Sequence, residues 1–165
     1  MRPWIPALAM TFSLCGPAAA SVLTPEGLGR LTVGMMEAEA ARRFALRIPK
    51  DDGTGGPECR LLSRKDWPSV LVMSEQGRIS RISLRAAGVR TDRGLRVGSR
   101  ESEVRRAYGA KLIVTGHKYE DAPAHYLTAW TVPGHRGIRY ETDAKGIVRA
   151  IHAGGPSIEY VEGCL

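Results

Sequence analysis

Four histidines and a few nearby carboxylates are the side chains of this chain best suited to metal binding or acid–base chemistry. The histidines are His117, His125, His135 and His152. His117, Glu120 and Asp121 share one short segment and, with His125, form the best candidate set. None of the histidines has the H-E-x-x-H spacing that is typical of helical zinc sites. We therefore expect no metal and no cofactor, and a small hydrolase using His117 or His125 is only a distant alternative.

The first twenty residues have the pattern of a secretory signal peptide. Arg2 gives a positive start, residues 5–15 are apolar, and Ala18-Ala19-Ala20 supplies small residues before Ser21. The apolar run is too short to cross about 30 Å of hydrocarbon. We expect cleavage near Ala20 and a periplasmic or secreted mature protein.

Two cysteines, Cys59 and Cys164, lie beyond the predicted cleavage point. Two cysteines in an exported chain usually pair, so we expect a Cys59–Cys164 disulfide; the alternative is two unrelated buried thiols. A free Cys59 near a histidine would be a candidate nucleophile, but a disulfide would consume it. There is also no G-x-S-x-G motif, and the sequence therefore favours a protein that is not an enzyme.

Basic residues are concentrated in the middle of a chain whose formal net charge is +7. Residues 78–106 contain nine arginines and three acids, whereas basic and acidic residues balance in the rest of the mature chain. This pattern favours an anionic partner such as an acidic protein, a lipid phosphate or an acidic glycan. Interleaved aromatics are missing, which argues against nucleic acid. The alternative is a solvated surface that aids solubility. The candidate contacts within the segment are Arg81, Arg85, Arg96 and Arg100.

Two segments of the chain match each other at an offset of 64 residues. VGMMEAEAARRFA at 33–45 and VGSRESEVRRAYG at 97–109 share a Val-Gly start, two glutamates and an arginine. Each predicts a short helix entered through a tight turn at glycine. In the first, Met36, Ala40 and Phe44 have helical spacing. In the second, we expect Ser99 to be the N-cap and Gly109 to end the helix.

A second match supports the first. Residues 69–82 and 138–151 each read as strand, glycine-containing turn and strand, now at an offset of 69. We expect strands near 58–63, 69–74 and 78–84, and again near 125–131, 137–142 and 147–153. The sequence therefore predicts an α+β fold of two tandem units, 21–88 and 89–165, that form one compact domain.

The second unit carries about five additional residues. They fall in GHKYEDAPA at 116–124, which contains His117 and Tyr119. Insertions in scaffold loops are common places for function, so His117 and Tyr119 are further candidate contact residues.

The repeated Val33-Gly34-Met35 and Val97-Gly98-Ser99 helix starts, each followed by strands, resemble the tandem-repeat architecture of the beta-lactamase inhibitor protein. They also resemble the related fold of the small lipoprotein of the outer-membrane barrel-assembly machinery. The resemblance covers most of residues 24–162 and implies helices packed on an antiparallel sheet in a protein that binds other proteins. This chain departs from the pattern because its mature cysteines are not paired within each repeat and it has no lipid-anchor cysteine.

These observations favour an exported, non-enzymatic module that binds another envelope or secreted protein, as an inhibitor or an assembly accessory. The alternative is a binder of anionic envelope lipid or glycan through residues 78–106.

Overall fold

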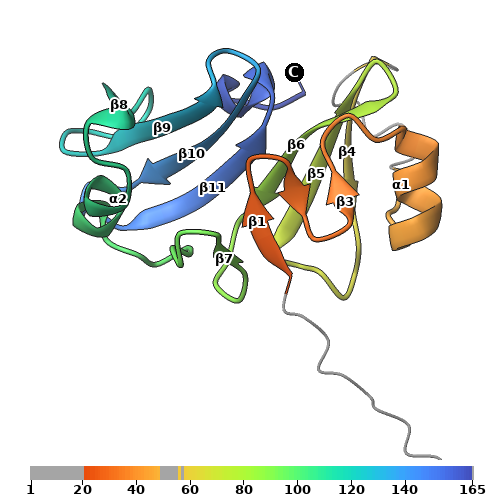
Figure 1. Cartoon of the computed structure of the whole chain (residues 1–165), viewed down its shortest axis with the longest axis horizontal. Coiled ribbons are helices and arrows are strands. Elements are labelled where there is room, and N and C mark those ends of the chain that lie inside the picture. Colours follow the sequence, from red (N-terminus) through yellow and green to blue (C-terminus); the bar gives the residue numbers. More distant parts are fainter. Residues whose placement is uncertain (1–20, 49–55, 57, 165) are drawn as a thin grey trace, which may run out of the picture.

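A computed structural model describes residues 21–48, 56 and 58–164. The predicted signal peptide at 1–20 lies outside the described residues. The fold is α+β, with a seven-stranded antiparallel sheet, a small four-stranded sheet and two eight-residue helices (Figure 1). No helix in the described part is long and apolar enough to span a membrane.

The larger sheet has the strand order β4-β5-β6-β11-β10-β9-β8, and all its pairs are antiparallel. Its strands are β4 (Cys59–Ser63), β5 (Val70–Glu75), β6 (Arg78–Leu84), β8 (Leu112–Gly116), β9 (His125–Val132), β10 (Arg136–Thr142) and β11 (Val148–Gly154). The two predicted hairpins form β5–β6 and β10–β11. They meet at the centre, where β6 pairs with β11, so one sheet runs through both predicted units.

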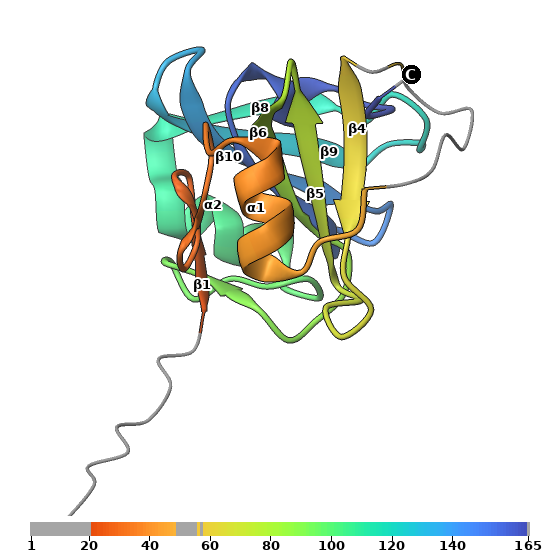
Figure 2. The same ribbon diagram turned by 90° about the vertical axis from the view of Figure 1, so that its right-hand side faces the viewer.

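The smaller sheet has the order β3-β2-β1-β7 and lies close to the N-terminal end of the described chain. Its strands are β1 (Val22–Thr24), β2 (Gly27–Leu28), β3 (Leu31–Thr32) and β7 (Arg90–Thr91). Leu23, Leu28 and Leu31 point into the main core. In Figure 1, β1 lies between the two halves of the large sheet, and in Figure 2 it lies beside α1 on one side of that sheet, so this small sheet covers part of the core-facing surface.

The helices α1 (Glu37–Phe44) and α2 (Glu101–Tyr108) lie toward opposite ends of the large sheet (Figure 1). Each begins after a glycine with positive φ, +92° at Gly34 and +96° at Gly98. The Gly34 N–H donates to the Ile79 carbonyl at 2.7 Å, and the Gly98 N–H donates to the Val148 carbonyl at 2.8 Å. Each helix start is therefore bonded to the beginning of the second strand of a hairpin, β6 for α1 and β11 for α2.

A glutamate at the first position of each helix repeats this arrangement. The Glu37 N–H donates to the Gly77 carbonyl and the Glu101 N–H to the Gly146 carbonyl, both at 2.8 Å. Glu37 is 7% exposed, and its carboxylate accepts hydrogen bonds from the Ser74 hydroxyl and from the Arg60 guanidinium. A buried carboxylate is tolerated only when it is bonded in this way.

Two local predictions at the helices are wrong. The N-cap of α2 is Arg100, whose N–H donates to the Glu103 carboxylate at 2.7 Å. The Ser99 hydroxyl instead accepts from the Arg96 N–H, one turn before the helix. Met36 is extended and 48% exposed, because it bridges to Arg78 instead of entering α1.

The opposite face of the large sheet is covered in part by the C-terminal segment, including the 3-10 turn η2 (Pro156–Glu159), which contacts β6, β10 and β11. The predicted disulfide is confirmed: Cys59, the first residue of β4, is bonded to Cys164. The last described residue is thus attached covalently to the edge of the sheet.

Candidate functional site

His117 organises its own loop. Its Nδ1 accepts hydrogen bonds from the N–H groups of Tyr119 at 3.2 Å and Glu120 at 3.1 Å, and its ring stacks on Tyr126 with centroids 4.4 Å apart. Tyr119 is 60% exposed. The interactions of His117 are those of a residue that shapes a loop, and Tyr119 alone of the predicted pair presents a large free surface.

His125 belongs to a different group of side chains. Its Nδ1 lies 3.1 Å from the Glu101 carboxylate, which also accepts from Thr142 and from Arg105. Burial raises the pKa of Glu101, but the bonds from His125 and Arg105 outweigh it and the net pKa is lowered. His125 and Tyr126 are neighbours on a strand and point to opposite faces, so His117 and His125 do not form one site. Within the described residues, no cluster of metal-ligating side chains is found.

A serine, a histidine and a glutamate form a hydrogen-bonded row on the face of the large sheet opposite the helices, and sequence analysis did not predict this arrangement. The Ser83 hydroxyl lies 2.8 Å from His152 Nδ1, and His152 Nε2 lies 3.0 Å from the Glu141 carboxylate. Burial lowers the pKa of His152 and outweighs the opposing effect of Glu141. These are the residue types of a hydrolytic relay, but Ser83 is 1% and His152 2% exposed. The alignment joins β6, β11 and β10, and a substrate does not reach it.

Arg81, a predicted surface contact, is buried at 2% exposure, so its assignment to a docking surface is wrong. Its guanidinium donates to the carbonyls of Ser157 and Tyr160, both at 2.9 Å, and thereby fixes the C-terminal segment to β6. Burial lowers its pKa to about 10. Arg81 lies on the inward side of that segment because residues alternate along the strand.

The remaining arginines of 78–106 are exposed but spread over the molecule. Arg78 and Arg85 lie at opposite ends of β6, about 23 Å apart at the usual rise of a strand. Arg96 precedes α2, and Arg100 lines a separate hollow of about 450 Å³ beside that helix. The segment therefore does not form one continuous patch; Arg85 contributes to a groove built largely by other segments.

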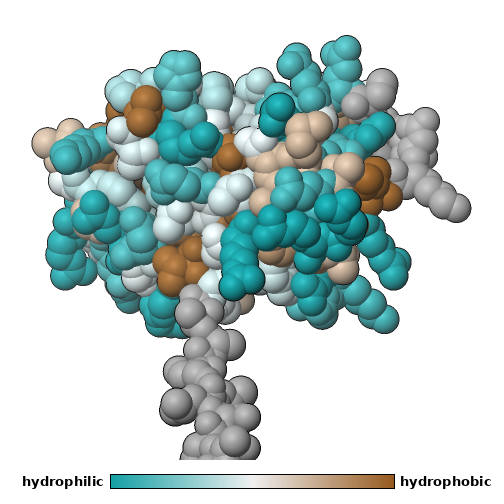
Figure 3. Space-filling model, turned by 45° about the vertical axis from the view of Figure 1, so that its right-hand side comes forward, coloured by the Kyte–Doolittle hydropathy of each residue, from teal (hydrophilic) through white to brown (hydrophobic). Residues whose placement is uncertain are grey.

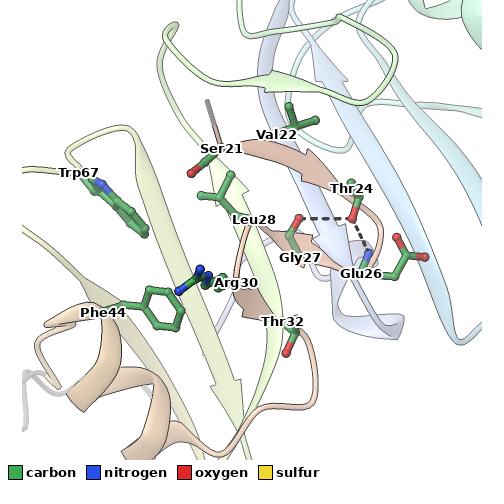
Figure 4. A pocket seen from close by; sticks show the side chains of 11 residues that line it. Ser21, Val22, Thr24, Glu26, Gly27, Leu28, Arg30, Thr32, Phe44 and Trp67 are labelled. Atoms are coloured by element: carbon green, nitrogen blue, oxygen red, sulfur yellow. Dashed lines mark hydrogen bonds between the residues drawn. The ribbon is translucent and has the colours of Figure 1, made fainter. Parts of the chain in front are cut away.

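That groove consists of two adjoining hollows. The first, of about 610 Å³, lies between the small sheet, the end of α1 and the β4–β5 connection (Figure 4). Trp67 and Phe44 stand on one side of it, and Val22 and Leu28 stand on the strands opposite, with Arg30 between. Val22 is 40% exposed, so part of this apolar surface is open to solvent.

The second hollow, of about 460 Å³, shares Trp67 with the first. It is lined by Arg47, Ser63, Arg64, Lys65, Trp67, Pro68, Val70, Leu71 and Arg85. Together we call the two hollows the Trp67 groove. Five basic residues and one acid line it. Figure 3 shows the side of the molecule that carries α1, where hydrophilic side chains surround smaller apolar areas.

One of the five basic residues is already committed to the fold. The Arg64 guanidinium forms a bidentate ion pair with Asp66, donates to the Phe44 carbonyl at 3.3 Å, and stacks over the Trp67 ring at 4.9 Å. The hydrogen bond from Arg64 lowers the pKa of Asp66. Arg64 therefore holds Trp67 in place instead of offering a free charge.

Four other cations of the groove have no acidic partner within the described part of the chain: Arg30 in the first hollow, and Arg47, Lys65 and Arg85 in the second. The three cations of the second hollow share its lining. They come from three segments: the chain after α1, the β4–β5 connection, and the residue after β6. Backbone bonds fix two of these segments to the sheet, from Arg47 N–H to the Ser63 carbonyl and from Arg85 N–H to the Ser69 carbonyl. Sequence reasoning found only Arg85, because nothing in the spacing of the others shows that the fold brings them together.

Comparisons with known proteins identify a fold and no function. No protein-family model and no curated protein matches the sequence. The uncharacterized protein yfeY from Escherichia coli is similar in structure, with a TM-score of 0.54 and 17% identity over 81% of this chain and 99% of that one. An extracellular protein containing an SCP domain, from Bacillus anthracis str. Ames, gives 0.50 and 5% identity over 90% of this chain and 50% of that one.

Proposed function

We propose that this chain is an exported, non-enzymatic module that binds a segment of another envelope or secreted protein in the Trp67 groove. The observation that carries the proposal is the combination of an apolar hollow with three uncommitted cations around one shared aromatic ring. Interface centres are rich in tryptophan and arginine, which supply large contact areas and directed hydrogen bonds.

The two hollows define the chemistry of the partner. An apolar or aromatic side chain fits between Trp67 and Leu28, where it removes apolar surface from water. Carboxylates placed one or two residues away on the same segment reach Arg47, Lys65 and Arg85. The partner segment is therefore acidic with at least one large apolar residue, and charge complementarity accelerates its association.

Export is part of the proposal. A disulfide between Cys59 and Cys164 is stable in an oxidising compartment, and such bonds are rare in the cytosol. One structural neighbour is an extracellular protein. Both observations are compatible with a periplasmic or secreted protein released by cleavage near Ala20.

A duplicated unit is also part of the proposal. The paired contacts at Gly34 and Gly98, and at Glu37 and Glu101, occur at positions that the 64-residue offset aligns. The groove does not repeat: its aromatic residue, Trp67, lies in the first unit. We infer that one half of a duplicated scaffold acquired the binding surface.

The test is capture of envelope proteins by the mature, oxidised protein at about 50 and 200 mM salt, followed by mass spectrometry. A double substitution, Lys65→Glu with Arg85→Glu, reverses two exposed charges of the groove. We expect it to reduce capture of one protein at least tenfold, at both salt concentrations. Arg149→Glu is the matched control, because Arg149 is 70% exposed on β11 and does not line the groove.

The salt dependence separates the proposal from its alternative. Recognition through an apolar centre weakens moderately at higher salt, whereas docking of exposed arginines on lipid or glycan is largely screened. Recovery of lipid or glycan only at low salt, and of no specific protein at the higher salt, would support the alternative. A captured protein that binds both variants equally would exclude the Trp67 groove.

A further inference from the structure

The outer edge of β8 is open. The His117 N–H donates to the Ala124 carbonyl, and the His125 N–H donates to the Thr142 hydroxyl on the β10 side. In an antiparallel pair, every second residue directs its backbone groups to the neighbouring strand, so these two bonds show which residues of β8 face β9. Ile113 and Thr115 therefore exchange backbone bonds with β9, and the alternate residues of β8 direct theirs outward.

Val114 lies at the centre of this outward row. By this alternation its N–H and carbonyl point away from β9, as do those of Gly116, and β8 is the last strand of the sheet within the described residues. The Leu112 N–H is used by the preceding 3-10 turn, η1 (Gly109–Lys111), while its carbonyl stays free. Such an edge is a template for another strand, and β8 has neither a proline, a bulge nor a charged residue that would block pairing.

The other end of the sheet is covered at one point. Arg47 bridges to Ser63 on the outer side of β4, with N–H to carbonyl distances of 2.7 and 3.4 Å. The edge strands of the small sheet, β3 and β7, are two residues long. Among the described residues, no such bridge lies on β8, and pairing of two copies about a twofold axis through this edge gives a closed dimer.

Charges on either side of β8 favour one pairing direction. Arg106 and Lys111 precede the strand, and Lys118, Glu120 and Asp121 follow it; all five are exposed. Lys118 is paired with Glu162 at 3.8 Å, which leaves Glu120 and Asp121 as the charges available at this end. In an antiparallel pair about a twofold axis, the start of one strand lies opposite the end of the other. The basic pair of each copy then faces the acidic pair of its partner, while parallel pairing would place like charges together.

We propose that two copies of this chain associate through β8, antiparallel and about a twofold axis at Val114, and so join their large sheets. Each Val114 N–H donates to the Val114 carbonyl of the other copy, and each Gly116 N–H donates to the Leu112 carbonyl. Ile113, which is 55% exposed, comes to lie beside Thr115 of the other copy. This surface does not share residues with the Trp67 groove, so the dimer is independent of the proposed function.

Two five-residue strands bury less area than a standard interface of about 1,600 Å², so we expect a weak dimer with a dissociation constant in the micromolar range. The test is sedimentation equilibrium of the mature, oxidised protein from about 1 µM to 1 mM. A shift from one to two copies over this range is expected. A monomer at every concentration would overturn the proposal.

Two variants locate the contact. Val114→Pro removes the outward N–H without removing a bond to β9, because proline is tolerated on an edge strand when the missing N–H faces outward. It is expected to stay monomeric at 1 mM. Val132→Lys is the control, because Val132 is exposed at 51% but lies at the end of β9. A dimer retained in Val114→Pro, or lost in Val132→Lys, would place the contact elsewhere.

Charge reversal tests the direction without altering β8. Glu120→Lys with Asp121→Lys gives one variant, and Arg106→Glu with Lys111→Glu gives another. Each alone is expected to dimerise at least tenfold more weakly, and an equimolar mixture is expected to form the mixed dimer. Since these side chains are exposed, folding is preserved. An unchanged affinity of either variant alone would refute the antiparallel arrangement, because a parallel pair already places like charges together in the wild type; failure of the mixture to associate more tightly than either variant would show that these charges do not lie at the contact.

Discussion

Removing the disulfide is expected to cost this protein a large part of its stability. The perturbation is the double substitution Cys59→Ser with Cys164→Ser, which leaves no free thiol in the mature chain. The bond joins residues separated by 105 positions, and it connects β4 to the segment that covers Arg81. Without the bond, the unfolded chain is no longer closed into a loop that spans most of the fold, and its conformational entropy rises.

The expected loss of stability follows from the length of the loop that the disulfide closes. In the chain-entropy treatment, a loop of about 100 residues corresponds to about 4.7 kcal/mol at 25 °C. Domains of this size have free energies of unfolding of about 5–15 kcal/mol. With a urea dependence of about 2 kcal/mol per molar, the unfolding midpoint should fall by about 2 M.

Urea unfolding of the wild type and the double variant, followed by far-UV circular dichroism, measures this difference. Reduced wild-type protein is the second sample and should behave like the variant. A loss below about 1 kcal/mol would refute the entropic reasoning. The urea dependence should also be larger for the variant, because its unfolded chain is no longer held compact by the bond.

Two further predictions concern single residues. Gly154→Ala should lower the free energy of unfolding by about 3 kcal/mol or more, measured by urea unfolding, because φ is +152° and a Cβ would lie 2.2 Å from the Ser80 carbonyl; a loss within error would contradict this packing. The lowered pKa of Glu101 means that its ionised form stabilises the fold above the unfolded value of 4.5, and this contribution disappears as pH falls through the lower folded pKa. Wild type should therefore exceed Glu101→Gln in stability at pH 7 and lose that advantage by pH 3; a pH-independent difference would exclude the bonds from His125 and Arg105 as its source.

The hairpins were predictable because their signals are local. The sequence predicts strands near 69–74 and 78–84, and the structure has β5 at 70–75 and β6 at 78–84. Alternating residues around a glycine turn specify such a hairpin without reference to the rest of the chain. The disulfide was predictable for a different reason: once residues 1–20 are interpreted as a signal peptide, two cysteines are left and only one pairing is possible.

The small sheet and β8 were missed. Strands of two or three residues, such as β2 at 27–28, carry too little periodicity to be distinguished from an extended segment. The run Leu112–Gly116 is apolar and short, and it follows a helix end directly. Its pairing with β9 depends on a contact across the loop at 116–124, which sequence analysis treated as an insertion.

The candidate site was largely hidden from sequence analysis. The net charge of 78–106 led to Arg81, which alternation on β6 places in the interior, and to Arg85, which lines the groove. Lys65 and Trp67 lie in a short connection without a motif. The fold brings them together with Arg47 and Arg85 because β4, β5 and β6 are neighbours in the sheet and Arg47 bridges to β4, which is a property of the tertiary fold.

Site-specific crosslinking tests the Trp67 groove most directly. Lys65→p-benzoylphenylalanine places a photoreactive group in the groove, and Arg149→p-benzoylphenylalanine places one on β11 as the control. After irradiation of cells that export each variant, the account predicts one crosslinked protein at position 65 that is missing at position 149. Its attachment site should lie in an acidic segment with a large apolar residue. The same adducts at both positions, or only lipid or glycan adducts at position 65, would contradict the account.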